Sequence, residues 1–200
     1  MKTRRVAIVV FDDVEVLDFA GPYEVFSVTG WQREMKPFEV FLVAEKPGPI
    51  VARNRFSINP HYTFESHPAA EIFLVPGGLG TRCEMHNPMM LNWVKKQAEN
   101  AELILSVCTG SLVLAAAGLL PERQATTHHL RFELLRQTEP RCIVLENKRV
   151  VVDGKIITSG GIAAGIDMSF VVVEQLLGTE VAEETARYME FPYQPSSHGK

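Results

Sequence analysis

Short runs of consecutive apolar residues constrain the fold of this 200-residue chain most strongly. Three of them are Val6–Phe11, Ile72–Val75 and Leu103–Val107. Apolar and polar residues hardly alternate within them, which is typical of strands in a parallel sheet that is covered on both faces. Segments with helical character lie between these runs. The sequence therefore predicts an α/β fold, a three-layer sandwich with a mostly parallel central sheet.

Helix-start and turn signals add further elements. Pro22 suits the first position of a helix over 21–28, and Asn87-Pro88 begins a helix that ends near residue 100. Asp153-Gly154 predicts a tight turn between two strands. The other expected strands are 38–44, one or two short strands within 50–58 separated at Asn54, 144–146, 150–152 and 156–158. The other expected helices are 110–118, 130–137, 161–177 and 180–189. We expect one domain over 1–200, with a loose tail over 193–200.

Cys108 stands directly after the Leu103–Val107 strand and before an Ala-rich helix. This order places its thiol at a sharp strand-to-helix turn, similar to a nucleophile elbow with Gly110 as the last glycine. Free N–H groups at a helix start favour an anion, so the position predicts a thiolate-prone nucleophile. The alternative is a small buried cysteine that only packs. The N–H of Thr109 can point at developing negative charge, and its hydroxyl can bind substrate or water.

Two further segments are expected near Cys108, because sites in such folds lie at the carboxyl ends of the strands. Gly77 and Gly78 end one strand, and together with Thr109 their backbone is expected to form an oxyanion hole; the alternative is a simple turn. Asp18 follows the first strand and has two interpretations. It either caps a helix, or lies beside the thiol, where it holds a proton, hydrogen-bonds the sulfur or activates water. Glu15 competes with it but is expected on the exposed side.

His128 and His129 follow two threonines at an expected helix start, where Thr127 can act as the cap. A Cys–His catalytic pair would require one of them near Cys108, but a helix-entry pair is the simpler interpretation. No third ligand has a matching spacing, so no metal site is expected. Cys83 and Cys142 have no activating context and are interpreted as bystanders.

Composition excludes several function classes. The formal net charge is −4, which argues against nucleic-acid binding by this chain alone. The three cysteines are widely spaced, so they predict neither a disulfide framework nor a C-x-x-C metal pair, and they suit a reducing compartment. The first apolar run is too short for a signal peptide, and no stretch is long enough to cross a bilayer. We therefore expect a cytoplasmic protein without a cofactor.

An ordered set of motifs resembles the ThiJ/PfpI superfamily, and within it the isonitrile (isocyanide) hydratase branch and the sensor half of some AraC-type transcription regulators. The motifs are Val6–Phe11, Leu17-Asp18-x-x-Gly21-Pro22, Pro76-Gly77-Gly78, Ser106-Val107-Cys108-Thr109-Gly110-Ser111, Gly118-Leu119-Leu120, Ala125-Thr126-Thr127-His128 and Thr158-x-Gly160-Gly161-Ile162-x-Ala164-Gly165-Ile166-Asp167.

This resemblance implies the class I glutamine amidotransferase-like (flavodoxin-like) fold and a homodimer. It also implies that Cys108 is the nucleophile, Asp18 the carboxylate and Thr109 the following threonine of a hydratase. Peptidase-like relatives carry a histidine where Thr109 stands, and amidotransferases carry a C-terminal His-x-Glu that does not occur near Met189. His129 replaces an aromatic residue of the hydratases, which would alter the substrate pocket.

Two functions follow as expectations. The first is Cys-dependent hydration of a small electrophile, such as an isocyanide to an N-substituted formamide. The second is a non-catalytic or redox-sensing module in stress response or transcriptional regulation, because an exposed thiol of low pKa oxidises readily. The chain has no room for a helix-turn-helix pair after its last helix, so we expect the enzyme rather than a stand-alone regulator.

Overall fold

A seven-stranded sheet forms the centre of the molecule, in the order β10-β11-β7-β6-β1-β2-β5. The structure is a computed structural model that describes residues 2–32, 34 and 36–195. Its strands are β1 Arg4–Val9, β2 Phe38–Ala44, β5 Tyr62–Thr63, β6 Ile72–Val75, β7 Leu103–Val107, β10 Val150–Asp153 and β11 Ile156–Ser159. Neighbouring strands are parallel except in the β10–β11 hairpin, which confirms the mostly parallel sheet.

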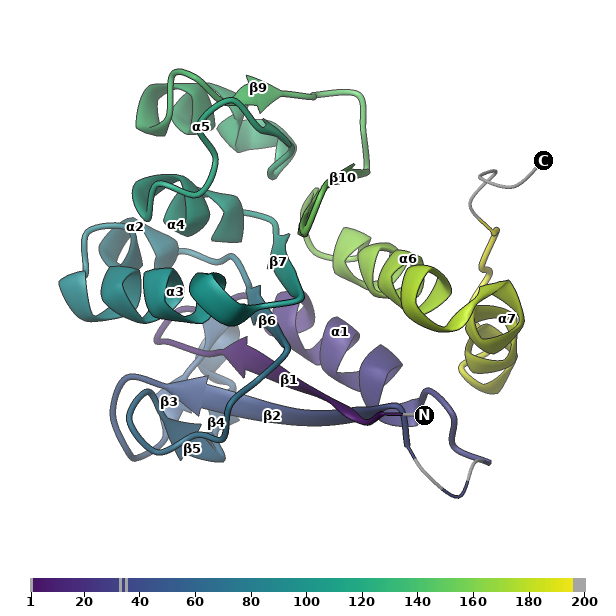
Figure 1. The fold of residues 1–200 in the computed structure, drawn as a ribbon. Helices are drawn as coiled ribbons and strands as arrows, with labels where there is room; N and C mark the ends of the chain where they lie inside the picture. The colour runs from purple at the N-terminus through teal and green to yellow at the C-terminus, as the bar shows by residue number, and fades with distance from the viewer. Residues whose placement is uncertain (1, 33, 35, 196–200) are drawn as a thin grey trace.

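Helices cover both faces of this sheet, so the fold has three layers. In Figure 1, α1, α6 and α7 lie on one side of the sheet and α2, α3 and α4 on the other. The helices are α1 Val16–Val28, α2 Thr81–Glu84, α3 Pro88–Asn100, α4 Gly110–Ala116, α5 Phe132–Thr138, α6 Ala164–Leu177 and α7 Thr179–Tyr188, with short 3-10 turns at Arg53–Arg55 and His129–Arg131. Among the described residues, no helix has the length and apolarity that a membrane crossing requires.

Two small strand pairs stand outside the central sheet. The antiparallel pair is β3 Ile50–Val51 with β4 Ser57–Ile58, and the parallel pair is β8 Gln124–Ala125 with β9 Ile143–Val144. Asn54 between β3 and β4 has a φ of 57°, a left-handed conformation that asparagine tolerates well. The predicted break at Asn54 is confirmed.

The apolar core fills the space between the layers. Ile8, Leu74 and Leu105 from neighbouring strands have no exposed surface, and neither do Phe26 on one side and Leu114 on the other. Burial of a side chain of this size contributes about 1.5–3 kcal/mol to folding. The continuous apolar runs of the sequence are therefore explained by burial on both faces of the sheet.

One predicted boundary is wrong in a way that matters for the site. The first helix begins at Val16 rather than at residue 21, so Pro22 lies inside it and Asp18 lies in its first turn. Pro22 removes only one backbone donor, and the buried Phe19 and Phe26 of the same helix keep it packed. The tail is anchored at Tyr193, whose hydroxyl donates to Glu174 at 2.8 Å. Residues 196–200 of that tail lie outside the described residues.

Candidate active site

Cys108 occupies the turn between β7 and α4 in a left-handed backbone conformation, with a φ of 56°. Such a conformation costs a non-glycine residue roughly 1–3 kcal/mol and persists only where the surroundings enforce it. The Cys108 N–H donates to the carbonyl oxygens of Ser159 at 3.2 Å and Gly160 at 3.1 Å. Its carbonyl oxygen accepts hydrogen bonds from the hydroxyls of Thr127 at 2.9 Å and Ser111 at 3.2 Å. Four hydrogen bonds therefore hold this peptide segment in a strained geometry.

Two glycines let the end of β6 approach the Cys108 turn. A Cβ atom on Gly77 would lie 2.6 Å from the Thr109 nitrogen and 2.7 Å from the Cys108 Cβ. A Cβ atom on Gly110 would overlap the carbonyl oxygen of Val75. Both positions therefore require glycine for close contact between neighbouring strand ends.

Asp18 reaches the same place from the first turn of α1. The N–H of Glu15 donates to the carbonyl oxygen of Gly77 at 2.9 Å, which holds the start of α1 beside β6. The Asp18 carboxyl has no exposed surface. Its Oδ2 accepts from the N–H of Gly77 at 3.0 Å and its Oδ1 from the N–H of Ile162 at 3.0 Å. The Cys108 thiol lies beside the carboxyl and affects its pKa, so α1, β6, β7 and the turn before α6 meet at this acid.

The Thr109 hydroxyl is held by the end of β6. Its Oγ1 accepts a hydrogen bond from the N–H of Gly78 at 3.0 Å. Since the N–H of Gly77 donates to Asp18, both glycine N–H groups already have acceptors. An oxyanion hole at Gly77 and Gly78 stays a prediction, and it would require these N–H groups to change partners. The N–H of Thr109, in contrast, lies beside the Cys108 sulfur.

Burial has the largest effect on the pKa values of Asp18 and Cys108. It raises the pKa of Asp18 to about 7, although hydrogen bonds from Gly77, Cys108 and Ile162 oppose the shift. Burial, followed by the charge of Asp18, raises the pKa of Cys108 to about 12, against hydrogen bonds from Thr109 that lower it. The predicted thiolate is therefore wrong for this state, because desolvation and the neighbouring carboxylate outweigh the donors at the helix start. The pair is a neutral thiol beside an acid that titrates near neutral pH.

Comparison with known proteins identifies the family. The model of the DJ-1/PfpI family matches residues 4–175. The chain belongs to the DJ-1/PfpI family. It is 35% identical over 192 residues to the isonitrile hydratase of Pseudomonas putida, covering 96% of this chain and 80% of the relative.

Two more proteins are similar to this DJ-1/PfpI member, a transcriptional regulator and a family member with a solved structure. The HTH-type transcriptional regulator CdhR of Pseudomonas aeruginosa is 27% identical over 172 residues, which cover 80% of this chain but only 51% of the regulator. The crystal structure of a ThiJ/PfpI family protein from Pseudomonas syringae superposes with a TM-score of 0.88 at 28% identity, covering 100% of this chain and 80% of that one. The predicted family and fold are thus confirmed.

The two histidines of this DJ-1/PfpI member lie at the rim of the site region. The His128 ring packs directly against Gly161, because a Cβ atom on Gly161 would overlap that ring. The His129 side chain is exposed, and its ring centroid is 4.4 Å from that of His128. Capping of a helix by Thr127 is wrong: its hydroxyl binds the Cys108 carbonyl, while the His128 side chain accepts from the Leu130 N–H at the start of the 3-10 turn.

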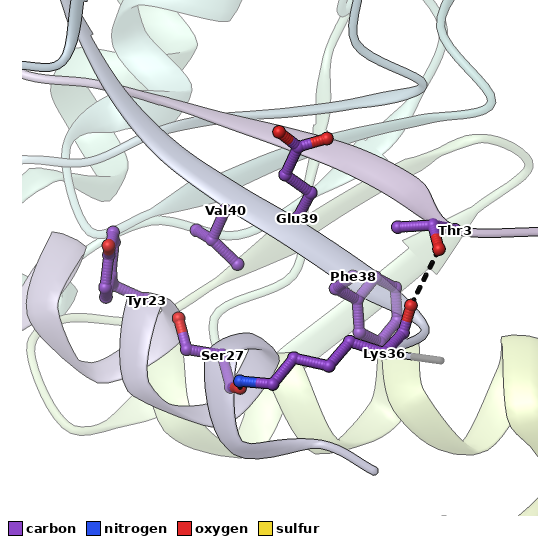
Figure 2. Close-up of a pocket in the computed structure, with 7 residues that line it drawn as sticks. All are labelled: Thr3, Tyr23, Ser27, Lys36, Phe38, Glu39 and Val40. Carbon is purple, nitrogen blue, oxygen red and sulfur yellow. Dashed lines mark hydrogen bonds between the residues drawn. The ribbon is translucent and has the colours of Figure 1, made fainter. Parts of the chain in front are cut away.

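A surface hollow of about 520 Å³ lies elsewhere, between α1 and β2 (Figure 2). Its lining residues are Thr3, Tyr23, Ser27, Lys36, Phe38, Glu39 and Val40. The Thr3 hydroxyl donates to the Lys36 carbonyl oxygen at 2.8 Å across its rim. None of the candidate catalytic residues lines it, so this hollow is separate from the candidate active site.

Three residues of the site region make contacts that the sequence did not predict. Thr127 binds the Cys108 carbonyl, Ile162 donates to Asp18, and Thr81 contacts Thr109. The motifs containing Thr127 and Ile162 carried the family resemblance, but Thr127 was expected only to cap a helix and Ile162 had no assigned role. Thr81 follows the Pro-Gly-Gly turn in a helix of only four residues, α2, which gives no periodic signal.

Proposed function

We propose that this protein hydrates small isocyanides to N-substituted formamides, with Cys108 as nucleophile and Asp18 as the proton-transferring acid and base. The observation that carries the proposal is the buried Asp18 carboxyl, which lies beside the thiol and is fixed by the N–H groups of Gly77 and Ile162. The similarity to an isonitrile hydratase supports it. A neutral thiol beside a carboxylate suits an electrophile that must gain both a nucleophile and a proton at the same carbon.

The first step joins the thiol to the isocyanide carbon. Asp18, as carboxylate, takes the thiol proton while the sulfur forms a bond to that carbon, and the protonated acid then delivers the proton to the same carbon. The product is a thioimidate, in which carbon carries one hydrogen, the sulfur and a double bond to nitrogen. A pKa of Asp18 near 7 lets one group accept and return this proton at neutral pH.

The second step adds water. Asp18 removes a proton from a water molecule whose oxygen attacks the thioimidate carbon, and the nitrogen gains a proton. The resulting intermediate expels the Cys108 sulfur, which recovers its proton, and the carbon–oxygen double bond of the formamide forms. The Thr109 N–H and hydroxyl lie beside the sulfur and stabilise the negative charge that it develops as it leaves.

Turnover of cyclohexyl isocyanide tests the proposal, with N-cyclohexylformamide measured by mass spectrometry. We expect Cys108→Ala to lower turnover by roughly a thousandfold or more, and Asp18→Asn to lower it strongly as well. Cys142→Ala is the matched control, because Cys142 is also buried but lies outside the site. Absence of turnover by the parent protein would contradict the hydratase proposal. Full turnover by Cys108→Ala would contradict the assignment of Cys108 as the nucleophile.

A second candidate function is recognition of a small molecule without turnover, which the match to a transcriptional regulator supports. Calorimetric binding of isocyanide to a parent protein that releases no formamide would favour it. Redox sensing by Cys108 is the weaker form of this candidate, because the raised pKa of the thiol opposes the thiolate that oxidants attack.

We also propose the assembly and location that the sequence predicts. A homodimer would have twice the chain mass of 22.3 kDa in multi-angle light scattering. Cys83, Cys108 and Cys142 are all free thiols, in keeping with a reducing compartment such as the cytoplasm. The residues over 1–200 are proposed to fold as one domain around the central sheet.

A further inference from the structure

The turn between β11 and α6 contacts both Cys108 and Asp18. The Cys108 N–H donates to the carbonyl oxygens of Ser159 at 3.2 Å and Gly160 at 3.1 Å, where β11 ends. Two residues further on, the N–H of Ile162 donates to the Asp18 Oδ1 at 3.0 Å. The groups that hold this turn in place therefore influence the hydrogen bonding of the buried carboxyl.

Arg149, which directly precedes β10, contacts the chain on both sides of this turn. Its carbonyl oxygen accepts from the N–H of Gly160 at 2.9 Å, which extends the pairing of β10 with β11 by one residue. Its Nε lies 2.7 Å and its Nη2 2.6 Å from the Oδ2 of Asp167, in the first turn of α6. One residue therefore joins the strand end before the turn to the helix start after it.

The ion pair between Arg149 and Asp167 acts locally. Charge-assisted hydrogen bonds are short and strong, and two nitrogens on one carboxylate oxygen fix the orientation of the guanidinium group. Both side chains are partly exposed, so the pair adds little to overall stability. Ile162 lies between the two points that Arg149 holds, at Gly160 and Asp167. Displacement of this short segment would move the Ile162 N–H away from the Asp18 carboxyl.

We propose that Arg149 and Asp167 are positioning residues that hold the N–H of Ile162 on the Asp18 carboxyl. The inference rests on the proposed role of Asp18 as the proton-transferring group. It assigns neither residue a contact with substrate. A hydrogen bond from the Ile162 N–H favours the carboxylate over the protonated acid, so the two residues keep the pKa of Asp18 lower than burial alone would set it.

The ¹³C chemical shift of the Asp18 carboxyl, followed by NMR from about pH 4 to pH 9, reports this pKa without any substrate. The protein is labelled at its aspartates, and Asp18→Asn identifies the resonance. Arg149→Met keeps the aliphatic stem but removes the guanidinium group, and Asp167→Ala removes its partner. We expect each to raise the pKa of Asp18 by roughly 0.3 to 0.7 pH unit, a modest rise in keeping with a partly exposed ion pair. Cys108 and Glu15, which also influence this pKa, are the same in both variants.

The signs of the two shifts separate positioning from a simple effect of charge. Loss of the Arg149 charge would raise the pKa of Asp18 at a distance as well, but loss of the Asp167 charge would lower it. Displacement of the turn raises it in both variants. In the Arg149→Met background, Asp167→Ala should give no further rise. Arg123→Met is the matched control and should leave this pKa unchanged, because Arg123 pairs with Asp153 at the opposite end of the β10–β11 hairpin.

An unchanged or lowered pKa of Asp18 in folded Asp167→Ala protein would overturn the inference, and so would an unchanged pKa in Arg149→Met. An equal rise in Arg123→Met would also overturn it. Arg149→Gln is the substitute if Arg149→Met does not fold. The hydratase proposal fails separately, by absence of formamide from the parent protein.

Discussion

Asp18 is a carboxyl without exposed surface, and its raised pKa links the stability of the protein to pH. The ordinary value of 3.8 applies to the unfolded chain, while in the fold burial raises the pKa to about 7. Between these values the native state holds a proton that the unfolded state has lost. Raising the pH through this window therefore favours unfolding.

We predict that the free energy of unfolding of the parent protein falls, relative to Asp18→Asn, by on the order of 4 kcal/mol from about pH 4 to about pH 7. The amide of Asp18→Asn stays neutral across this pH range, so the variant lacks the fall in the free energy of unfolding that Asp18 causes in the parent protein. Urea unfolding at a series of pH values measures both curves. Asp153→Asn, on the β10–β11 hairpin beside Arg123, is the control and should keep the decline. Parallel curves for the parent and Asp18→Asn would contradict the prediction.

At the scale of elements, the close contact between the end of β6 and the β7–α4 turn depends on Gly77. Gly77→Ala would place a methyl group 2.6 Å from the Thr109 nitrogen and 2.7 Å from the Cys108 Cβ. We expect a loss of roughly 1–3 kcal/mol in stability and a large loss of turnover, because the two segments must separate. Gly160→Ala is the matched control at the same sheet edge, since its new Cβ would meet its nearest neighbour at 3.7 Å. Denaturation and turnover of both variants check this, and equal effects would refute it.

The sequence predicted the elements whose signals are local. Continuous apolar runs located β1, β6 and β7, and Asn87 before Pro88 located the start of α3, where the Asn87 side chain accepts from the Met89 N–H. The start of α1 was missed because Pro22 usually marks a first turn, whereas buried packing sustains the helix around it. The two-residue strands β5 and β8 and the four-residue helix α2 are too short to show a periodic pattern.

The sequence suggested residues of the candidate site but not the contacts between them. Cys108 followed from its strand-to-helix position, and Asp18 was chosen over simple capping through the family resemblance. The bonds of Thr127 and Ile162 could not be predicted, because they join segments far apart in the sequence. The charge state of the thiol was misjudged for the same reason: its burial and the contact with Asp18 exist only in the folded chain.

At the scale of the whole molecule, the three cysteines differ in how deeply they are buried. Cys83 in α2 is exposed, whereas Cys108 and Cys142 are buried and belong to one apolar core. Burial raises the pKa of both, to about 12 for Cys108 and about 11 for Cys142. In native buffer we therefore expect iodoacetamide to modify Cys83 first.

The same labelling in urea tests whether the active site opens separately from the core. Cys108 is held by segments from α1, β6 and the turn before α6, so full exposure of its side chain requires the separation of elements that also pack the core. We predict that the labelling rates of Cys108 and Cys142 rise steeply at the same urea concentration, which coincides with the loss of helical circular dichroism, because the unfolding is cooperative. Peptide mass spectrometry resolves the two sites. Exposure of Cys108 at a lower urea concentration than Cys142 would instead show that the site opens locally while the sheet stays folded.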